Sequence, residues 1–181
     1  DGESTSLEIG EGTVIREGVT IHRGTLGRGI GRTIVGKNCL LMAYVHIGHD
    51  CVLGDKVIMA NNASVAGHVV VGDYANFGGY SGVPQFRSIG ENTHIAAMSL
   101  VTKDVPAFMT VAGNPASAVG LNLEGMRRRG LSADALAALK ESHKIVYRSA
   151  LTKNKALNLL AGLRSKYSEV EKFARSIESS E

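Results

Sequence analysis

The fold is decided by residues 35–101, which read VGKNCLLMAYVHIGHDCVLGDKVIMANNASVAGHVVVGDYANFGGYSGVPQFRSIGENTHIAAMSLV. Every sixth residue is apolar, and the residue after it is in most cases Gly or Ala. An α-helix would repeat every 3.6 residues and an ordinary strand every two, so neither explains a strict period of six. Hexapeptide periods are typical of solenoids, in which short strands wind into stacked coils. The apolar positions are Val35, Leu41, Ile47, Leu53, Met59, Val65, Val71, Phe77, Val83, Ile89, Ile95 and Val101.

Each six-residue unit is expected to supply one short strand with one inward apolar side chain. The small residue that follows would then let the backbone turn a corner without a side-chain clash. Three units make one triangular coil, so residues eighteen apart should stack, and coils must stack to bury their apolar faces. The predicted columns are Ile47, Val65, Val83 and Val101; Leu53, Val71 and Ile89; and Met59, Phe77 and Ile95.

The repeat extends toward the N-terminus through Ile9, Ile15 and Ile21. Ile21 and Val35 lie fourteen residues apart, two more than two repeats, and the intervening Gly- and Arg-rich residues 26–33 predict a loop that leaves the prism. The chain opens within the pattern without an initiator Met or a capping coil, so we expect N-terminal coils to precede Asp1. Residues 1–116 are therefore predicted to form a parallel β-helix.

A second unit, residues 117–181, is predicted to be a C-terminal helical domain. The repeat fades after Val101, and Asn122–Gly130 is polar and basic. Ser132 is a favourable N-cap for a helix to about Arg148, and Thr152 for a second helix. A third, short helix is expected over 169–177. This tail would fold back to cap the last coil and cover its open sheet edge.

Composition narrows the classes of partner. The net charge of +3 is too weakly basic to predict nucleic-acid binding, and Trp, a good stacking platform for bases, is absent. The sequence shows neither a signal-peptide pattern nor an apolar run that could span a bilayer, so no stable membrane insertion is expected. Cys39 and Cys51 are twelve residues apart, which places them on different faces and disfavours a disulfide. Two buried thiols suit the reducing cytoplasm.

Histidines mark the candidate chemistry. His46 and His49 flank a turn in AYVHIGHDC, and His68 follows Gly67, eighteen residues after His49. The coil period should therefore gather these three imidazoles at one edge, with Asp50 beside them; His22 is a fourth candidate. A neutral imidazole can accept a proton near neutral pH. Two alternatives remain at this stage: polar residues simply displayed at solvated corners, and an open zinc site, although His-x2-His is unlike the His-x4-His of hexapeptide carbonic anhydrases.

A run of three arginines, Arg127–Arg129, admits three interpretations. It can be a solvated surface, a phosphate clamp built from guanidinium groups, or a contact for an acidic protein.

Four motifs together resemble the UDP-N-acetylglucosamine 3-O-acyltransferase family of lipid A biosynthesis. They are IREGVTIHRGT (15–25), LLMAYVHIGHDC (40–51), NNASVAGH (61–68) and GLNLEGMRRRG (120–130). The resemblance covers nearly the whole chain. It implies a homotrimer of left-handed parallel β-helices that moves a 3-hydroxyacyl group from acyl carrier protein to the 3-hydroxyl of UDP-N-acetylglucosamine, without a metal or other cofactor.

The resemblance also implies residue roles. His49 is similar to the general base, Asp50 to the group that orients it, and the Gly67 N–H to the donor that stabilises the oxyanion. His46, His68 and Gln85 resemble substrate-binding residues. Ala97 lies near the position that measures acyl length. The residues expected to hold the nucleotide and its phosphates are Asn122, Glu124, Arg128 and Arg129.

Some features depart from the family pattern. Pro84 and Pro115 stand where many members have His, and the family's Asp-x-Lys segment would precede Asp1. Three other functions therefore stay open: a related N-acyltransferase or other hexapeptide acyltransferase, a metal-dependent hydratase on the same prism, and an incomplete trimer that binds sugar nucleotide without turnover.

Overall fold

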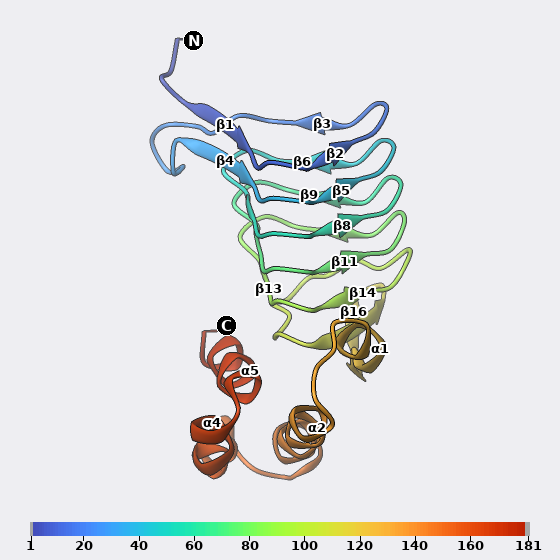
Figure 1. Ribbon diagram of the computed structural model, residues 1–181. Coiled ribbons are helices and arrows are strands. Elements are labelled where there is room, and N and C mark those ends of the chain that lie inside the picture. The colour runs from blue at the N-terminus through green and yellow to red at the C-terminus, as the bar shows by residue number, and fades with distance from the viewer. Residues whose placement is uncertain (1, 180–181) are drawn as a thin grey trace.

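The computed structural model describes residues 2–179 as a left-handed parallel β-helix followed by a helical tail. Figure 1 shows the coils stacked from the N-terminus downward, with the helices gathered beneath the last coil. The mainly β fold with C-terminal helices agrees with the prediction from the sequence.

Three sheets form the faces of the prism. Sheet A contains β1 (Ser6–Ile9), β4 (Arg32–Val35), β7 (Val52–Leu53), β10 (Val70–Val71) and β13 (Ser88–Ile89). Sheet B contains β2 (Val14–Ile15), β5 (Leu40–Leu41), β8 (Ile58–Met59), β11 (Asn76–Phe77), β14 (His94–Ile95), β15 (Met109–Gly113) and β16 (Ala116–Leu121). Sheet C contains β3 (Thr20–Ile21), β6 (His46–Ile47), β9 (Ser64–Val65) and β12 (Gly82–Val83).

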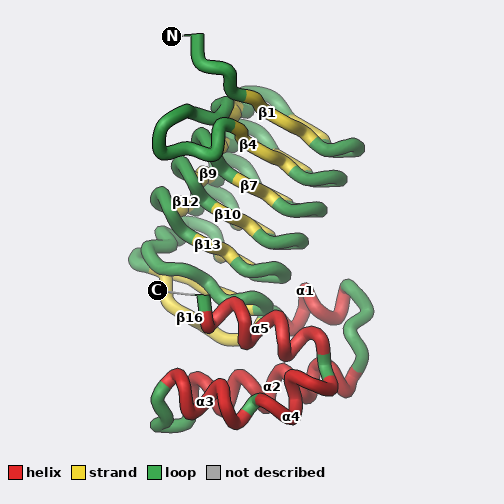
Figure 2. The backbone as a smooth tube through the Cα atoms, turned by 90° about the vertical axis from the view of Figure 1, so that its left-hand side faces the viewer, coloured by secondary structure: helices red, strands yellow, loops and turns green. Residues whose placement is uncertain are grey.

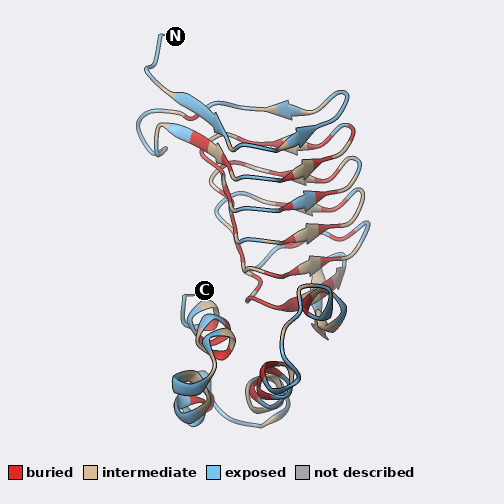
Figure 3. Ribbon diagram, viewed as in Figure 1, coloured by how far each residue is buried: buried red, intermediate tan, exposed pale blue. Residues whose placement is uncertain are grey.

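The predicted columns are confirmed by the strand register. Ile47 pairs with Val65 and Val65 with Val83 in sheet C. In sheets A and B, the columns that run through Val71 and Phe77 pair in the same way. The apolar second residue of each two-residue strand from β5 to β14 is buried, while the first faces outward, and Figure 3 shows this alternation. Burial of the repeated apolar position therefore supplies the core of the prism.

The corners need a small residue because successive coils stack closely. A Cβ on Gly48 would lie 2.6 Å from the Gly67 nitrogen of the next coil, so a side chain at this position would clash, as predicted. The left-handed backbone conformation falls two residues after the small residue, for example at Asp50 (φ 59°) and His68 (φ 63°).

The expected loop excursion, 26–33, falls largely in the connection between β3 and β4, which ends at residue 31 because Arg32 and Thr33 belong to β4. Figure 2 shows this loop projecting from the coil stack. After β14 the chain makes an antiparallel hairpin of β15 and β16 that extends sheet B, which the sequence analysis did not predict. β16 crosses the boundary proposed at residue 116, so that boundary stays a prediction.

The tail contains α1 (Leu123–Arg128), α2 (Ala133–Arg148), α3 (Lys153–Leu159), α4 (Ala161–Lys166) and α5 (Ser168–Glu178). Ser132 caps α2 as predicted, because its side chain accepts a hydrogen bond from Ala135 N–H. The second predicted helix is divided at Leu160 into α3 and α4. α1 was missed; the polar run that contains it starts with Asn122, whose side chain caps Gly125 N–H.

The tail caps the last coil, as expected. Ala107 N–H donates to the Ser176 hydroxyl of α5 at 2.9 Å, and Lys172 pairs with Glu91. Cys39 and Cys51 are both buried free thiols. Within residues 2–179, none of the helices has the length and apolar character needed to cross a membrane.

Candidate active site

Each coil turns at three corners, which we name by the sheets that they join. The A–B corner contains residues 36–39, 54–57, 72–75 and 90–93; the B–C corner contains residues 42–45, 60–63, 78–81 and 96–99. The C–A corner contains residues 48–51, 66–69 and 84–87. His49, Asp50, Gly67 and His68 therefore lie on neighbouring coils of one corner, although eighteen residues separate the two pairs.

His49 and Asp50 form a dyad. His49 Nδ1 lies 2.8 Å from Asp50 Oδ2. The Asp50 side chain is fully buried, whereas 38% of the His49 side chain is exposed. A carboxylate only accepts hydrogen bonds, so Nδ1 carries the proton and Nε2 keeps a free lone pair. In its neutral form, the imidazole of the dyad therefore presents Nε2 as a base at the surface of the prism.

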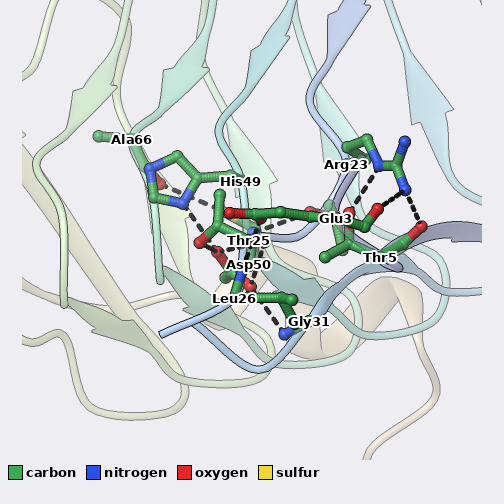
Figure 4. Close-up of polar contacts among 11 residues, drawn as sticks. Glu3, Thr5, Arg23, Thr25, Leu26, Gly31, His49, Asp50 and Ala66 are labelled. Atoms are coloured by element: carbon green, nitrogen blue, oxygen red, sulfur yellow. Dashed lines mark hydrogen bonds and ion pairs between the residues drawn. The ribbon is translucent and has the colours of Figure 1, made fainter. Parts of the chain in front are cut away.

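The loop excursion holds the Asp50 carboxylate. Thr25 N–H donates to both oxygens at 3.1 Å, the Thr25 hydroxyl donates to Oδ2 at 2.6 Å, and Gly31 N–H donates to Oδ1 at 3.1 Å. Figure 4 shows these contacts converging from both ends of the loop. Asp50 N–H in turn donates to the buried Thr33 hydroxyl at 2.8 Å. The loop is therefore the support of the dyad.

These donors set the protonation state of Asp50. Burial alone would raise the pKa of this carboxyl group, but hydrogen bonds from the Thr25 hydroxyl, His49 and Thr25 N–H outweigh it and lower the pKa to about 2. Asp50 is thus a permanent anion at neutral pH. An anion beside Nδ1 stabilises the imidazolium that forms when His49 accepts a proton.

Gly67 lies beneath the His49 ring. A Cβ on Gly67 would come within 2.8 Å of both Nε2 and Cε1 of that ring. No acceptor within residues 2–179 is hydrogen-bonded to Gly67 N–H. A free backbone donor next to the base is the arrangement that an oxyanion requires.

The four candidate histidines meet in two ring pairs, and one member of each pair, His22 and His49, lines the same cavity. The rings of His49 and His68 meet edge to face with centroids 4.9 Å apart, and those of His22 and His46 do the same at 4.9 Å. His46 lies on the outer face of sheet C, where its Nδ1 is 2.8 Å from the Thr20 hydroxyl oxygen. Burial, followed by the proximity of His22, lowers the pKa of His46, which favours its neutral form.

One cluster has the composition of a cation site. The donor atoms of His49, Asp50 and His68 lie within 4.8 Å of one another. Both Asp50 oxygens and His49 Nδ1 already take part in hydrogen bonds of the dyad and the loop. The Asp50 oxygens, which a metal would need as ligands, are engaged by these four donors, so the geometry fits a proton-transfer dyad better than a zinc centre.

His49 opens on a cavity of about 640 Å³, whose wall includes His22, Arg23 and Thr25. The predicted nucleotide residues line a different cavity of about 560 Å³, between α1 and the outer face of sheet B. The two cavities share no lining residue. One chain therefore brings together His49, Asp50, Gly67 and His68, but it does not place them with Asn122, Glu124, Arg128 and Arg129.

The two arginines of the second cavity differ. The Arg129 guanidinium stacks 3.8 Å above the Tyr74 ring, and it donates to Tyr74 O at 2.8 Å and to the Asn92 side chain. The Arg128 side chain is 77% exposed, and among the described residues its one ion pair is with Glu124 of the same helix. Arg129 therefore anchors α1 to the prism, and Arg128 is the more available cation.

Two other predicted residues lie at corners. Gln85 is exposed at the C–A corner, one coil beyond His68. Ala97 is exposed at the B–C corner. Its backbone packs closely on Gly78 of the preceding coil, because a Cβ added to Gly78 would lie 2.3 Å from the Ala97 nitrogen.

Sequence reasoning missed Thr25, Gly31 and Tyr74. Thr25 and Gly31 could have been found from the sequence. They lie at the two ends of the Gly-rich stretch where the period of six is broken by two residues, and such a loop needs contacts that hold it to the prism. Tyr74 carried no signal beyond its place at a corner.

Comparisons with known proteins identify the family of the chain. A family model described as UDP N-acetylglucosamine O-acyltransferase, domain 2, matches residues 104–181, and a bacterial transferase hexapeptide model matches residues 32–67. The acyl-[acyl-carrier-protein]–UDP-N-acetylglucosamine O-acyltransferase of Ectopseudomonas mendocina is 50% identical over 99% of this chain and 69% of its own length. The chain belongs to the UDP-N-acetylglucosamine O-acyltransferase family.

Solved structures of this acyltransferase family extend the agreement to three dimensions. The Moraxella catarrhalis enzyme superposes with a TM-score of 0.96 at 46% identity, covering 100% of this chain and 70% of that one. The Acinetobacter baumannii enzyme gives 0.94 at 43% identity, with the same shares. The fold and family expected from the sequence motifs are therefore confirmed.

Proposed function

We propose that this acyltransferase moves a 3-hydroxyacyl group from acyl carrier protein to the 3-hydroxyl of UDP-N-acetylglucosamine, the first step of lipid A biosynthesis. The observation that carries the mechanism is the buried, loop-held Asp50 that fixes His49 with a free Nε2. Family membership supports the choice of donor and acceptor.

His49 acts as the general base. Its Nε2 takes the proton of the sugar hydroxyl while the oxygen attacks the thioester carbonyl carbon, and the π electrons move to the carbonyl oxygen. Asp50 stabilises the imidazolium at that moment. A positioned base of this kind contributes roughly 10²- to 10⁴-fold to the rate.

Gly67 N–H stabilises the negative oxygen of the tetrahedral intermediate. The intermediate collapses by breaking its C–S bond, and the proton held by His49 passes to the leaving thiolate. The reaction forms one ester bond and breaks one thioester bond without an acyl-enzyme. His46, His68 and Gln85 hold the acceptor sugar, and the step requires no cofactor from the protein.

The second cavity holds the nucleotide. Arg128 supplies an exposed guanidinium for phosphate oxygens, while Asn122, Glu124 and Arg129 shape the pocket. Ala97 limits acyl length from the B–C corner.

A homotrimer unites the two cavities. The base lies at the C–A corner beside sheet C, whereas the nucleotide residues lie against sheet B. If sheet C of one copy faces sheet B of the next around a threefold axis, the B–C corner points to that axis. The column at this corner consists of Tyr44, Asn62, Tyr80 and Met98, and its three large side chains, Tyr44, Tyr80 and Met98, are 62%, 65% and 70% exposed. Large apolar side chains gathered on one exposed edge are typical of an interface.

The setting proposed is the cytoplasm. The proposed acceptor is a sugar nucleotide and the proposed donor is a carrier protein, both of which are soluble. The buried thiols of Cys39 and Cys51 are unpaired, which suits a reducing compartment.

The test incubates the chain with UDP-N-acetylglucosamine and a mixed pool of 3-hydroxyacyl thioesters of acyl carrier protein. Mass spectrometry of the product should show one O-acylated sugar nucleotide and give its acyl length. His49→Ala should abolish the product without changing metal content. Sugar-nucleotide binding without product would favour a non-catalytic role. Loss of bound zinc together with activity in His49→Ala would favour the hydratase.

A further inference from the structure

We propose that Phe86 is a positioning residue of the active site, which holds the His68 ring against His49. The proposal rests on the acyltransferase function argued above. Phe86 occupies the C–A corner one coil beyond His68 and two beyond the dyad.

The contact is an aromatic stack. The rings of Phe86 and His68 are nearly parallel, at 8°, with centroids 4.5 Å apart. His68 then meets His49 edge to face, at 90° and 4.9 Å. Each ring of this series is therefore packed on the next. Such aromatic pairs prefer defined geometries, which is why they orient side chains as well as bury them.

The backbone of Phe86 reinforces the same corner. Phe86 N–H donates to Gly67 O at 3.2 Å, and His68 N–H donates to His49 O at 3.0 Å. The corner that holds the base and the proposed oxyanion donor is thus hydrogen-bonded, coil by coil, to Phe86. Its backbone has the same left-handed conformation, φ 62°, as Asp50 and His68 at the equivalent positions of the two preceding coils.

Burial in the core does not account for Phe86. The residue is 58% exposed, and its inward neighbour in the repeat is Val83. What its ring does contact is one face of His68. Asp50 fixes Nδ1 of His49 and Gly67 lies next to its ring, while His68 is the one aromatic ring within residues 2–179 that packs at right angles against it. Without the phenyl ring, His68 can turn away and leave His49 without this lateral support.

The test is a double-mutant cycle on kcat/KM. Phe86→Leu keeps apolar volume but removes the flat ring, and Phe86→Tyr is the matched control that retains it. In the otherwise native chain, Phe86→Leu should lower kcat/KM about fivefold, while Phe86→Tyr should stay within about twofold of the native value. In a His68→Ala background, Phe86→Leu should have almost no effect, because the residue through which it acts is gone.

An NMR measurement separates this proposal from the proposed function. The ring current of Phe86 should shift the carbon-bound proton resonances of His68, and Phe86→Leu should remove that shift even if the chain turned over no substrate. Unchanged His68 resonances in Phe86→Leu would overturn the stack. An equal loss of kcat/KM with and without His68 would show that Phe86 acts by another route, and equal losses for Leu and Tyr would show that the ring is not what matters.

Discussion

Asp50→Asn should disable the base by reversing its tautomer. The four donors around the carboxylate decide how the amide can sit. At the Oδ1 position, an NH2 group would face the N–H groups of Thr25 and Gly31, which are fixed donors. At the Oδ2 position it would face Thr25 N–H, the Thr25 hydroxyl and His49 Nδ1, of which the last two can become acceptors.

The amide NH2 will therefore take the Oδ2 position. His49 Nδ1 must then accept a hydrogen bond, so the proton moves to Nε2, where the lone pair of the base had been. We expect kcat to fall roughly 10³-fold, within the contribution of a general base, and the charge lost beside the imidazolium acts in the same direction. One fixed donor, Thr25 N–H, loses part of its pairing, which should cost about 1–3 kcal/mol of stability.

Steady-state kinetics and long-range ¹⁵N–¹H correlation spectra of the His49 ring measure the two effects separately. The native chain should show the proton on Nδ1 and the variant should show it on Nε2, while the circular dichroism spectrum stays that of the folded prism. The reasoning is refuted if Asp50→Asn keeps the proton on Nδ1, or if the tautomer reverses and kcat does not fall.

Three further predictions follow from the same contacts. Gly67→Ala places a Cβ 2.8 Å from His49 Nε2 and should displace the ring, lowering kcat roughly 100-fold; Gly162→Ala, which meets nothing within 4 Å, is the control and should leave kcat unchanged. Arg129→Ala should destabilise the chain by about 1–3 kcal/mol in urea unfolding because two hydrogen bonds to the prism are lost, whereas Arg128→Ala should change stability by less than about 1 kcal/mol and raise KM for the sugar nucleotide; the assignment of the two arginines fails if these effects are exchanged. Asp50 has a pKa of about 2 in the folded chain, below its ordinary value of 3.8, so its contribution to stability is complete above pH 4 and is lost as the pH falls toward 2; urea titrations at a series of pH values should show this loss for the native chain and not for Asp50→Asn.

The sequence predicted the prism well because one physical requirement repeats. Every coil needs an inward apolar residue and a close approach to the next coil, so residues such as Ile47 and Gly48 carry information about all three sheets. The period also predicted that Gly67 and His68 lie beside His49. These contacts follow from counting and require no knowledge of the loops.

Other features depend on contacts that have no period. The hairpin of β15 and β16 and the short helix α1 lie beyond the repeat, where local propensity is weak and packing decides. The role of Thr25 depends on how the loop returns to Asp50, and the anchoring of Arg129 depends on Tyr74, 55 residues away. The small residue of the repeat was predicted to avoid a side-chain clash, and the clash that a Cβ on Gly48 would make is with the backbone of the next coil.

The central claim is that each site combines His49 of one copy with the α1 cavity of another. The direct measurement is the activity of two variants, His49→Ala and Arg128→Glu, each of which should be inactive when expressed alone. The two variants are then coexpressed so that mixed oligomers form, and the activity is measured again. If the sites are shared around a threefold axis, coexpression should restore about a quarter of native activity, since each of the two contributing copies carries the needed residue half of the time. Native mass spectrometry verifies that mixed oligomers have formed. If these mixed oligomers are inactive, the account is contradicted.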